Sequence, residues 1–390
     1  MPWKECHVVD ERVRFVRRLL DGESMTGLCE EFGISRKTGY KIFQRYQQIG
    51  VRGLSDRSRR PYRHANQLPA AVEAVIVRLK KDRPSWGAPK IRERLRQRWP
   101  DIPCPAISTV HAVLDRQGLV AHRRRRRRPR LTGTPLAAVA HPNGLWCADY
   151  KGEFLLRNQR YCYPLTISDY ASRYLLACEA LSTTQERYAF SVFERAFQDF
   201  GLPDALRTDN GVPFAQPNAL GRLGALALWW IRLGIRPEHI TPATPSENGA
   251  HERFHKTLKA HVTHPVARTM AAQQRGFDTF QAEYNFDRPH ASLPNHQPPA
   301  QCYAPSPRPY PRRLPPLEYP EATLVRRVQG GGAIKWRGHP IFLSVNLAGD
   351  DVSLTELADD CMEIRYATLI LGAFDLHTQR FLPNVRWVDR

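Results

Sequence analysis

Apolar side chains recur with a helical period through the first third of the chain. Residues 10–48 predict three helices, because a turn at Gly33 separates the apolar stripes and Ser35 is placed to cap the last helix. That last helix is expected to turn three aromatic side chains inward, Tyr40, Phe43 and Tyr46. Its outward positions then carry side chains that contact phosphates and base edges: Arg36, Lys37, Lys41 and Gln44. The pattern is typical of a helix-turn-helix domain.

The same arrangement recurs over residues 68–120, where three more segments of helical pattern follow one another. Any short three-helix unit shares this pattern, so one copy alone is weak evidence. Two copies in tandem on a basic background predict two helix-turn-helix DNA-binding domains, over residues 1–60 and 61–121.

From about residue 141 the pattern changes to the alternation of strands. Two or three antiparallel strands are expected over 145–181, then an amphipathic helix that stops at Gly201, and a short strand over 205–211. A helix over 219–235 and another short strand follow, and then helices over 249–263 and 270–286. This order of elements is that of a ribonuclease H-like fold, which predicts an α/β catalytic core over residues 141–303.

Two further segments complete the expected multidomain α+β chain. Residues 304–320 hold seven prolines and predict an extended linker. Residues 321–390 alternate between apolar and polar positions with Gly turns, which predicts a small β-barrel at the C-terminus.

Charge is concentrated at the front of the molecule. The chain has 58 Lys and Arg against 38 Asp and Glu, a formal charge of +20. Residues 1–135 hold 31 of the basic and 13 of the acidic side chains, so the rest is nearly balanced. Such an excess needs a polyanion as partner, most often nucleic acid. In the linker expected over 122–140, a run of arginines suits contact with DNA phosphates: Arg123, Arg124, Arg125, Arg126, Arg127, Arg128 and Arg130.

Cysteine spacing and hydropathy limit the compartment. The eight cysteines form no CxxC pair, so neither a zinc ribbon nor a redox motif is indicated. The first residues have no apolar signal core, and the longest apolar run, LGALALWW, is too short to span a bilayer. We therefore expect a soluble, cytoplasmic protein with no membrane partner.

The stretch SENGAHERFHKTLKAH, residues 246–261, supports two incompatible interpretations. His251, Glu252 and His255 form HExxH, the helical zinc-protease motif, and His261 is a candidate third ligand. The long form of that motif requires Gly at position 258 to turn the chain, and this chain has Leu258. The same letters contain Asn-Gly-x-x-Glu-Arg, in which Glu252 would serve a nucleic-acid enzyme instead.

Three acidic positions favour the second interpretation. Asp149 lies in the strand WCADY, Asp209 ends the strand RTDNG, and Glu252 lies on the helix. In a ribonuclease H-like fold these places converge. Clustered carboxylates repel one another unless divalent cations neutralise them, and their oxygen atoms suit Mg²⁺ or Mn²⁺. Two such ions about 4 Å apart would activate a water or a 3′-hydroxyl for attack on a phosphodiester.

These residues resemble the DDE transposases of bacterial insertion sequences, relatives of the retroviral integrases. The resemblance rests on WCADY, RTDNG, ENGAHERFHKTLK and YNFDRPHASL, followed by Pro299 and Tyr303, and extends over nearly the whole chain. It implies that Asp149, Asp209 and Glu252 bind the metal ions. It also implies that Lys256 and Lys259, on the same helix face as Glu252, contact transposon-end DNA. The turn that starts this helix would be formed by Asn248-Gly249.

The sequence departs from the family pattern in two places. The gap between Asp209 and Glu252 is longer than usual by about two helical turns, and the extra residues are expected to lengthen the helix over 219–235. The front of the chain also lacks the His/Cys zinc module of retroviral integrases.

The resemblance implies a transposase that binds terminal inverted repeats, cleaves the element ends and joins the 3′-hydroxyls to target DNA. Two ends must be joined together, so at least a dimer is expected on DNA. A regulatory derivative without cutting activity and a hydrolytic nuclease of the same fold are alternatives, and a zinc peptidase is a remote one. In the favoured interpretation His251 and His255 flank the site, where they either orient phosphate or pack.

Overall fold

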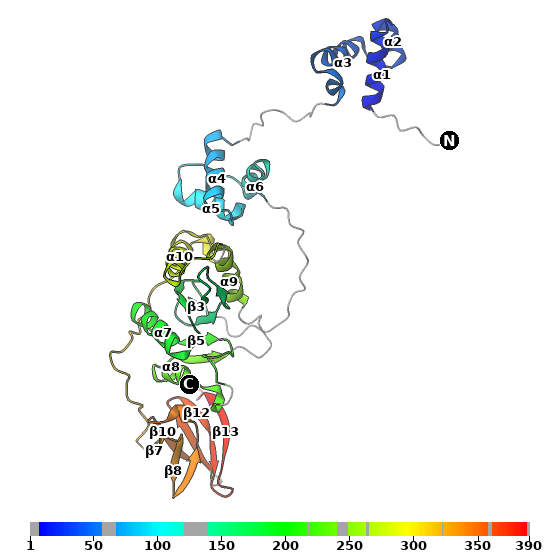
Figure 1. Ribbon diagram of the computed structural model, residues 1–390. Helices are drawn as coiled ribbons and strands as arrows, with labels where there is room; N and C mark the ends of the chain where they lie inside the picture. The colour runs from blue at the N-terminus through cyan, green and yellow to red at the C-terminus, as the bar shows by residue number, and fades with distance from the viewer. Residues whose placement is uncertain are drawn as a thin grey trace. The chain divides into compact units, whose positions relative to one another are not determined.

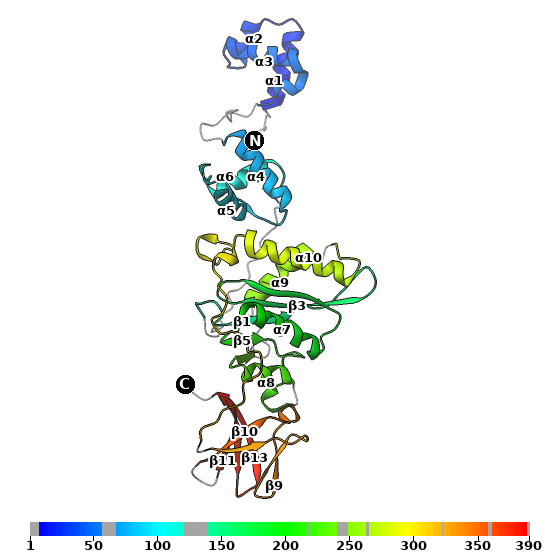
Figure 2. The same cartoon turned by 90° about the vertical axis from the view of Figure 1, so that its left-hand side faces the viewer.

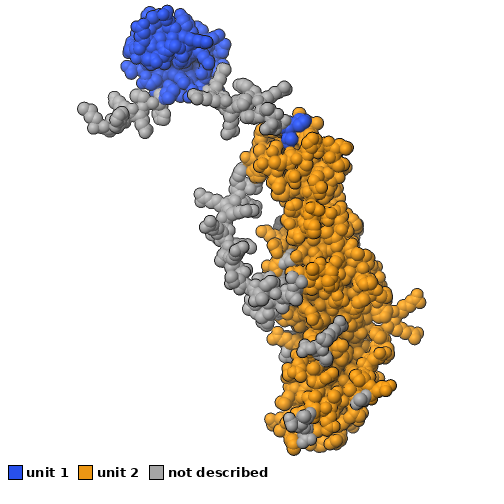
Figure 3. Space-filling model, turned by 180° about the vertical axis from the view of Figure 1, so that it is seen from behind, with its two compact units in different colours: residues 1–69 blue, residues 70–390 orange. Residues whose placement is uncertain are grey.

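The computed structural model describes residues 8–56, 68–120, 139–216, 219–239, 249–262, 265–321, 323–357 and 361–387. The chain divides into two compact units, residues 1–69 and residues 70–390, which Figure 3 colours separately. Among the described residues, every helix is too short or too polar to cross a membrane.

The first unit is a helix-turn-helix domain made of three α-helices and a 3-10 turn. They are α1 (Val8–Leu20), α2 (Met25–Glu31), α3 (Arg36–Ile49) and the turn Gly50–Leu54 (Figure 1). The Ser35 hydroxyl caps α3 as expected, accepting the Thr38 amide at 3.2 Å. The core is formed by Phe15, Val16, Leu28, Cys29 and Leu54.

One inward position of α3 differs from the sequence expectation. Phe43 and Tyr46 pack against the core, but the Tyr40 side chain is 60% exposed. Its neighbour Gly39 is buried, and a Cβ there would lie 2.5 Å from the Cys29 sulfur. The helices approach each other closely at this glycine, which turns Tyr40 outward.

The second unit begins with another three-helix bundle. Its helices are α4 (Ala70–Asp82), α5 (Ala88–Arg98) and α6 (Ile107–Arg116). Ile76, Ile91 and Val110 are fully buried between them. Salt bridges tie the bundle to the following core, with Arg83 3.0 Å from Glu283 and Arg94 2.7 Å from Asp287.

The core is built on one mixed sheet of six strands. They are β1 (Trp146–Tyr150), β2 (Phe154–Leu155), β3 (Tyr161–Asp169), β4 (Leu175–Leu181), β5 (Ala205–Thr208) and β6 (Arg236–His239). β3 pairs antiparallel with β1, β2 and β4, whereas β1, β5 and β6 run parallel. The long β3 therefore joins an antiparallel half of the sheet to a parallel half.

Helices cover both faces of this sheet (Figure 2). One face packs against α9 (Gly249–Val262) and α10 (Met270–Ala282), through a cluster that includes Leu175, Phe254, Leu258 and Phe277. The other face packs against α7 (Glu186–Phe200) and α8 (Ala225–Arg232). α10 continues into a π-helical turn, Glu283–Asp287, and short 3-10 turns follow at Pro294–His296 and Pro299–Gln301. This is the layered, ribonuclease H-like arrangement expected from the order of elements.

The helix expected over 219–235 is shorter than the sequence suggested. α8 has eight residues, and the segment before it forms a separate 3-10 turn, Leu220–Arg222. Gly221 and Arg222 have φ angles of 59° and 60°, a left-handed conformation that ends a helix. The longer gap between Asp209 and Glu252 therefore does not lengthen this helix.

The proline-rich segment is extended, as expected, but it is also packed on the core. Arg308 donates to the carbonyl oxygens of Pro203, Leu233 and Gly234 at 2.9 to 3.0 Å. Tyr310 lies against the rings of Phe197 and Trp229.

The C-terminal region does not form the β-barrel expected for residues 321–390. Its strands are β7 (Leu324–Arg327), β8 (Ala333–Trp336), β9 (His339–Phe342), β10 (Asp351–Leu357), β11 (Cys361–Tyr366), β12 (Leu369–Asp375) and β13 (Arg380–Trp387), with a 3-10 turn at Val345–Leu347.

Five of these strands make an open sheet in the order β13-β12-β11-β10-β7, and β8-β9 is a separate hairpin. Among the described residues no ladder joins the edge strands β7 and β13, so the sheet does not close. Alternation along the sequence identifies strands, but it carries no information on whether the two edges of a sheet meet.

Candidate active site

Asp149 and Asp209 lie at the same end of neighbouring strands. β1 and β5 are parallel, and Cys147 is paired with Arg207. Asp149 stands two residues beyond Cys147, and Asp209 stands two residues beyond Arg207. The carboxyl ends of the two strands therefore bring the two carboxylates together.

Glu252 joins this pair from the first turn of α9. Burial, together with the negative charges of Asp209 and Glu252, raises the pKa of Asp149 to about 7. Burial also raises the pKa of Asp209, although the Gly211 amide donates to its Oδ1 at 3.1 Å. Glu252 itself is exposed. We call these three residues the acidic cluster, in which the charges of Asp209 and Glu252 both disfavour the ionised form of Asp149.

A buried hydroxyl connects α9 to the strand that carries Asp149. Thr166 on β3 faces Asp149 across the ladder, and its hydroxyl donates to the Asp149 carbonyl oxygen at 3.0 Å. The Nε2 atoms of His251 and His255 both lie 2.8 Å from this same hydroxyl oxygen. Thr166 is fully buried, so this hub fixes the distance between α9 and the sheet at the acidic cluster.

The hub also determines the tautomers of the two histidines. A hydroxyl has one proton, which Thr166 gives to Asp149, so both imidazoles must donate to it from Nε2. Each Nδ1 is then an acceptor. The His251 Nδ1 lies 3.2 Å from the Ser168 hydroxyl. Burial lowers the pKa of His251 to about 3 and that of His255 to about 2, which keeps both rings neutral.

The Nδ1 acceptor of His255 faces the carboxylate of Asp149. The His255 Nδ1 lies 3.7 Å from Asp149 Oδ2, so two electron-pair donors point at each other. Either a proton on Asp149 or a cation between the two would relieve this repulsion. Ligand atoms of Asp149, His251 and His255 lie within 4.8 Å of one another, a grouping that suits a metal ion.

The arrangement differs from a zinc-protease site in one respect. α9 continues through His261, as the absence of a glycine at position 258 indicated. The His261 Nε2 contacts Ser85 at 2.6 Å and Arg288 at 3.2 Å, so this side chain is engaged away from the other two histidines. The third group beside the histidine pair is Asp149, and carboxylate oxygens from two strands fit a hard divalent cation.

The side chains expected to contact DNA are solvent-exposed where they are described. On α3 these are Arg36, Lys37, Lys41 and Gln44, and on α9 they are Lys256 and Lys259. The expected contacts from the arginine run, Arg123 to Arg128 with Arg130, and from Asn248 in the turn before α9, lie outside the described residues.

The role of Thr166 is not evident from the amino-acid sequence. It lies in an apolar strand, where a buried threonine is an ordinary β-branched residue. Only the cross-strand register and the packing of α9 reveal that its hydroxyl contacts His251 and His255, which lie 85 and 89 positions later in the sequence.

Family comparisons agree with this architecture. The front of the chain matches a helix-turn-helix domain over residues 11–62 and a homeodomain-like domain over residues 38–114. The core matches an integrase core domain in two segments, residues 139–245 and 233–299. These segments contain Asp149, Asp209 and Glu252.

Two similar proteins come from bacterial insertion elements. An uncharacterized 39.2 kDa protein of insertion element IS476 from Xanthomonas euvesicatoria is 27% identical over 255 residues, covering 64% of this chain and 70% of the relative. An uncharacterized 31.7 kDa protein of insertion element IS407 from Burkholderia multivorans is 25% identical over 202 residues, covering 47% of this chain and 70% of the relative.

Solved structures with partial likeness include retroviral integrases. The HTLV-2 integrase catalytic core in complex with magnesium aligns with a TM-score of 0.33 and 14% identity, covering 42% of this chain and 98% of that one. The integrase of a simian T-cell lymphotropic virus intasome aligns with a TM-score of 0.35 and 14% identity, covering 81% of this chain and all of that one. The family matches and the two relatives show that this chain has a helix-turn-helix front and an integrase core, and that it is similar to proteins of bacterial insertion elements.

Proposed function

We propose that this chain is an active transposase that cleaves DNA at the ends of its own element and joins the new 3′-hydroxyls to target DNA. Asp149, Asp209 and Glu252 are the residues that hold the catalytic metal ions. The observation that carries the proposal is the position of Asp149 and Asp209 at the same end of two adjacent parallel strands, with Glu252 near enough on α9 for its charge to raise the pKa of Asp149. A fold keeps such repulsion when a cation normally relieves it.

The carboxylates fit Mg²⁺ or Mn²⁺, and two such ions would supply an activated oxygen nucleophile and stabilise the leaving oxygen. The protein's own residues set the geometry. Thr166 and the two histidines hold α9 against β3, so Glu252 is kept at a fixed distance from Asp149. Because His255 is neutral and accepts at Nδ1, it adds no positive charge that would compete with the cation.

DNA recognition is assigned to the two helix-turn-helix domains. On α3 the exposed Arg36, Lys37, Lys41 and Gln44 form one surface, and the exposed ring of Tyr40 belongs to the same surface. Lys256 and Lys259 extend from α9 beside Glu252, where they would hold the strand that is cut. The arginine run would contact the phosphate backbone between the two regions. At least two copies would assemble on the paired ends.

An assay with the element's own terminal sequence tests the proposal. The purified full chain is incubated with Mg²⁺, a labelled duplex that carries the terminal repeat, and an unlabelled target plasmid. We expect nicking at the element boundary and covalent transfer of label to the plasmid. Nicking at the boundary without transfer would identify a hydrolytic nuclease, and binding without either product would identify a regulatory derivative.

The choice of metal separates the peptidase interpretation from this one. Activity is measured after chelation and after return of Mg²⁺, Mn²⁺ or Zn²⁺. Recovery with Mg²⁺ or Mn²⁺ is expected, because most of the ligand atoms are carboxylate oxygens. Tight retention of one Zn²⁺ by His251 and His255, with no DNA cleavage in Mg²⁺, would contradict the proposal.

A further inference from the structure

A second candidate site lies on the other flank of α9 from Glu252. It is a cavity of about 250 Å³. Arg253 and Thr257 line it from one side of the helix, roughly 100° and 140° around the axis from Glu252 at about 100° per residue. The remaining walls come from β1, β3, the turn after β3, α5 and the loop after the π-helical turn. We call it the cationic pocket and define it by Lys90, Arg173, Arg253, Arg288 and His290.

Positive charge in this pocket has no acidic partner within it. All fourteen lining residues are neutral or basic. Burial, together with the charges of Arg173, Lys90, Arg288 and Arg253, lowers the pKa of His290 to about 4. Among the described residues no carboxylate forms a salt bridge with any of these four cations. The nearby Glu283 is paired with Arg83.

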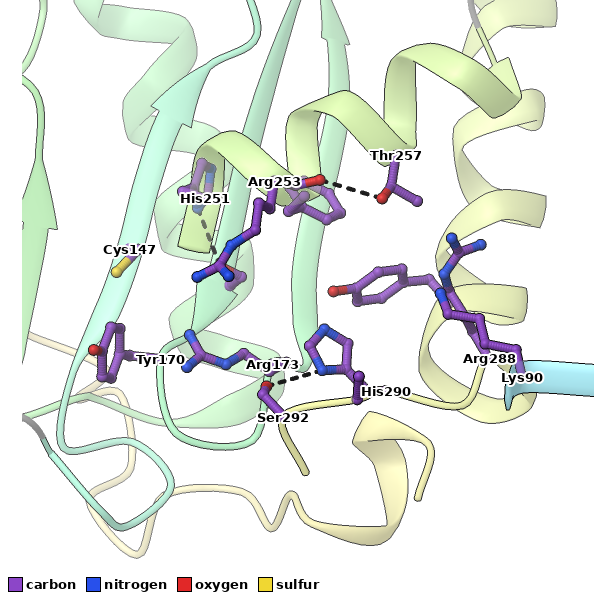
Figure 4. Close-up of a pocket in the computed structure, with 14 residues that line it drawn as sticks. Lys90, Cys147, Tyr170, Arg173, His251, Arg253, Thr257, Arg288, His290 and Ser292 are labelled. Atoms are coloured by element: carbon purple, nitrogen blue, oxygen red, sulfur yellow. Dashed lines mark hydrogen bonds between the residues drawn. The ribbon is translucent and has the colours of Figure 1, made fainter. Parts of the chain in front are cut away.

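Figure 4 shows the side chains of Arg253 and Arg173 extending from opposite sides into the same space beside His290. Arg288 is 94% buried, since its exposed fraction is 6%, and its Nη1 contacts the neutral ring of His261 at 3.2 Å. Burial also lowers the pKa of Lys90 to about 8, with a smaller contribution from Arg288. Four cations held this closely repel one another, and an anion would relieve that repulsion.

The backbone at Arg173 adds independent evidence. Arg173 has a φ angle of 63°, in the left-handed region that favours glycine or asparagine. The turn is held by Asp169, whose Oδ2 accepts from the amide and the hydroxyl of Ser172. A long cationic side chain therefore occupies a position where glycine would be easier to accommodate. Such positions cluster at binding sites.

Aromatic rings give the pocket an apolar wall. The Arg173 guanidinium lies 4.7 Å from the ring centre of Tyr170, and Phe254 and Tyr284 also line the cavity. Cations beside aromatic rings are the combination that binds single nucleic-acid strands, with phosphate on the cations and sugar or base against the rings. A cavity of about 250 Å³ is too small for a duplex, so only part of a single strand could enter it.

We propose that the cationic pocket binds a phosphodiester group of the DNA strand whose neighbouring bond lies at the acidic cluster. The proposal rests on the proposed function, because it takes the DNA at the acidic cluster as given. Arg253 follows Glu252 directly on α9, so one strand that crosses this helix turn reaches both flanks. Arg288 and His290 belong to the segment YNFDRPHASL, and in this proposal their role is to bind the phosphate.

Equilibrium binding of the full chain tests the proposal without any cleavage. The probe is a fluorescein-labelled duplex of the element's terminal sequence, titrated in EDTA at several salt concentrations. Arg173→Asn removes the charge and suits the left-handed backbone, so its melting temperature should not fall. Its Kd should rise severalfold, and the slope of log K against log salt should shrink by about 0.9, the value for one phosphate contact.

The matched control is Arg187→Asn. Arg187 is exposed on α7 and lies 4.8 Å from the ring of Tyr188, so it has the same aromatic stacking outside the pocket. It should leave both the Kd and the salt slope unchanged. If Arg173→Asn destabilises the fold, Arg253→Gln on α9 replaces it with the same expected loss. Wild-type values in Arg173→Asn and in Arg253→Gln would overturn the proposal.

A scan of the DNA identifies the phosphate. Single methylphosphonate substitutions neutralise one phosphate at a time near the cleaved bond. At one position the methylphosphonate should weaken DNA binding by the wild type but should not weaken binding by Arg173→Asn any further. If no position behaves this way, and inorganic phosphate raises the melting temperature of the wild type but not of Arg173→Asn, the pocket binds a small anion and the DNA assignment is wrong. Failure of cleavage by the wild type would count against the proposed function only.

Discussion

The two flanks of α9 carry opposite charge. On one flank Asp149, Asp209 and Glu252 form the acidic cluster, and on the other Arg173 and Arg253 belong to the cationic pocket. Glu252 and Arg253 are consecutive residues of this helix, so the two flanks meet within one turn. Each flank is a local cost to the fold, because like charges are held together in partly buried surroundings.

Three sides of α9 therefore have different surroundings. Its buried face is neutral, with His251 and His255 bonded to Thr166. A cation on one flank and a phosphate on the other would then be bound at fixed separation, which is what a reaction on a phosphodiester needs.

Loss of the acidic flank is the largest effect that we expect. Asp149→Asn, Asp209→Asn and Glu252→Gln should each reduce DNA cleavage by roughly 10³-fold or more, because each removes a metal ligand. Binding to the terminal duplex should be almost unchanged. The measurement is cleavage and binding of the same labelled duplex. A variant that still cuts DNA would remove its residue from the proposed metal site.

Loss of the neutral face should have a smaller effect. Thr166→Val keeps the shape but removes the hydroxyl, so activity or metal affinity should fall by about 10- to 100-fold. The readout is the Mg²⁺ and Mn²⁺ concentration needed for half-maximal cleavage. Thr166→Ser restores the hydroxyl and should recover most of the activity. Equal loss in both variants would show that packing, and not the hydrogen bonds, is what matters.

Relief of repulsion on the acidic flank should stabilise the protein when metal is absent. Native Asp149 keeps its proton to about pH 7, whereas an unfolded chain loses it near 3.8. Stability is therefore lost as pH rises from about 4 to about 7, by up to about 4 kcal/mol. In EDTA at pH 8, Asp149→Asn should melt at a higher temperature than the wild type, and the difference should vanish toward pH 4.

The control for this measurement is Asp101→Asn, which changes an exposed carboxylate in the three-helix bundle. Its melting temperature should follow the wild type across the same range. Added Mg²⁺ should stabilise the wild type more than Asp149→Asn. If the wild type is more stable than Asp149→Asn at pH 8 in EDTA, the inferred repulsion of Asp149 by Asp209 and Glu252 is wrong.

The smallest effect is expected on the cationic flank. Lys90 has a pKa of about 8, because burial and Arg288 disfavour its charged form. Below pH 8 it is charged and attracts phosphate, and above pH 8 it is neutral. DNA affinity at fixed salt should therefore weaken by a few fold between pH 7 and pH 9. Lys90→Gln should bind more weakly at pH 7 and lose this part of the pH dependence.

Local pattern was enough for most elements and for the candidate acids. Helical periodicity and capping at Ser35 predicted α3, and the end of α7 at Gly201 followed from the same signals. Asp149 and Asp209 were found because they follow apolar strands in WCADY and RTDNG. The predicted helix start and helix end are confirmed because the residues that determine them are neighbours in the chain.

Other features depend on contacts between distant segments. Tyr40 is turned outward because Gly39 lets two helices approach closely, and the C-terminal sheet stays open because its edge strands do not pair. The cationic pocket gathers Lys90, Arg173 and His290 from segments far apart in the sequence. No local pattern marks these residues as a group.

By itself, then, the amino-acid sequence determined the helix-turn-helix units, the order of strands and helices in the core, the basic front and the identity of the candidate acids. Those properties follow from composition and from spacings of a few residues, which set local conformation and charge. Only the tertiary structure decided what surrounds each side chain. It joined Thr166 to two histidines, raised the pKa of Asp149 and separated an acidic from a cationic flank on one helix, because burial and charge proximity depend on distances through space.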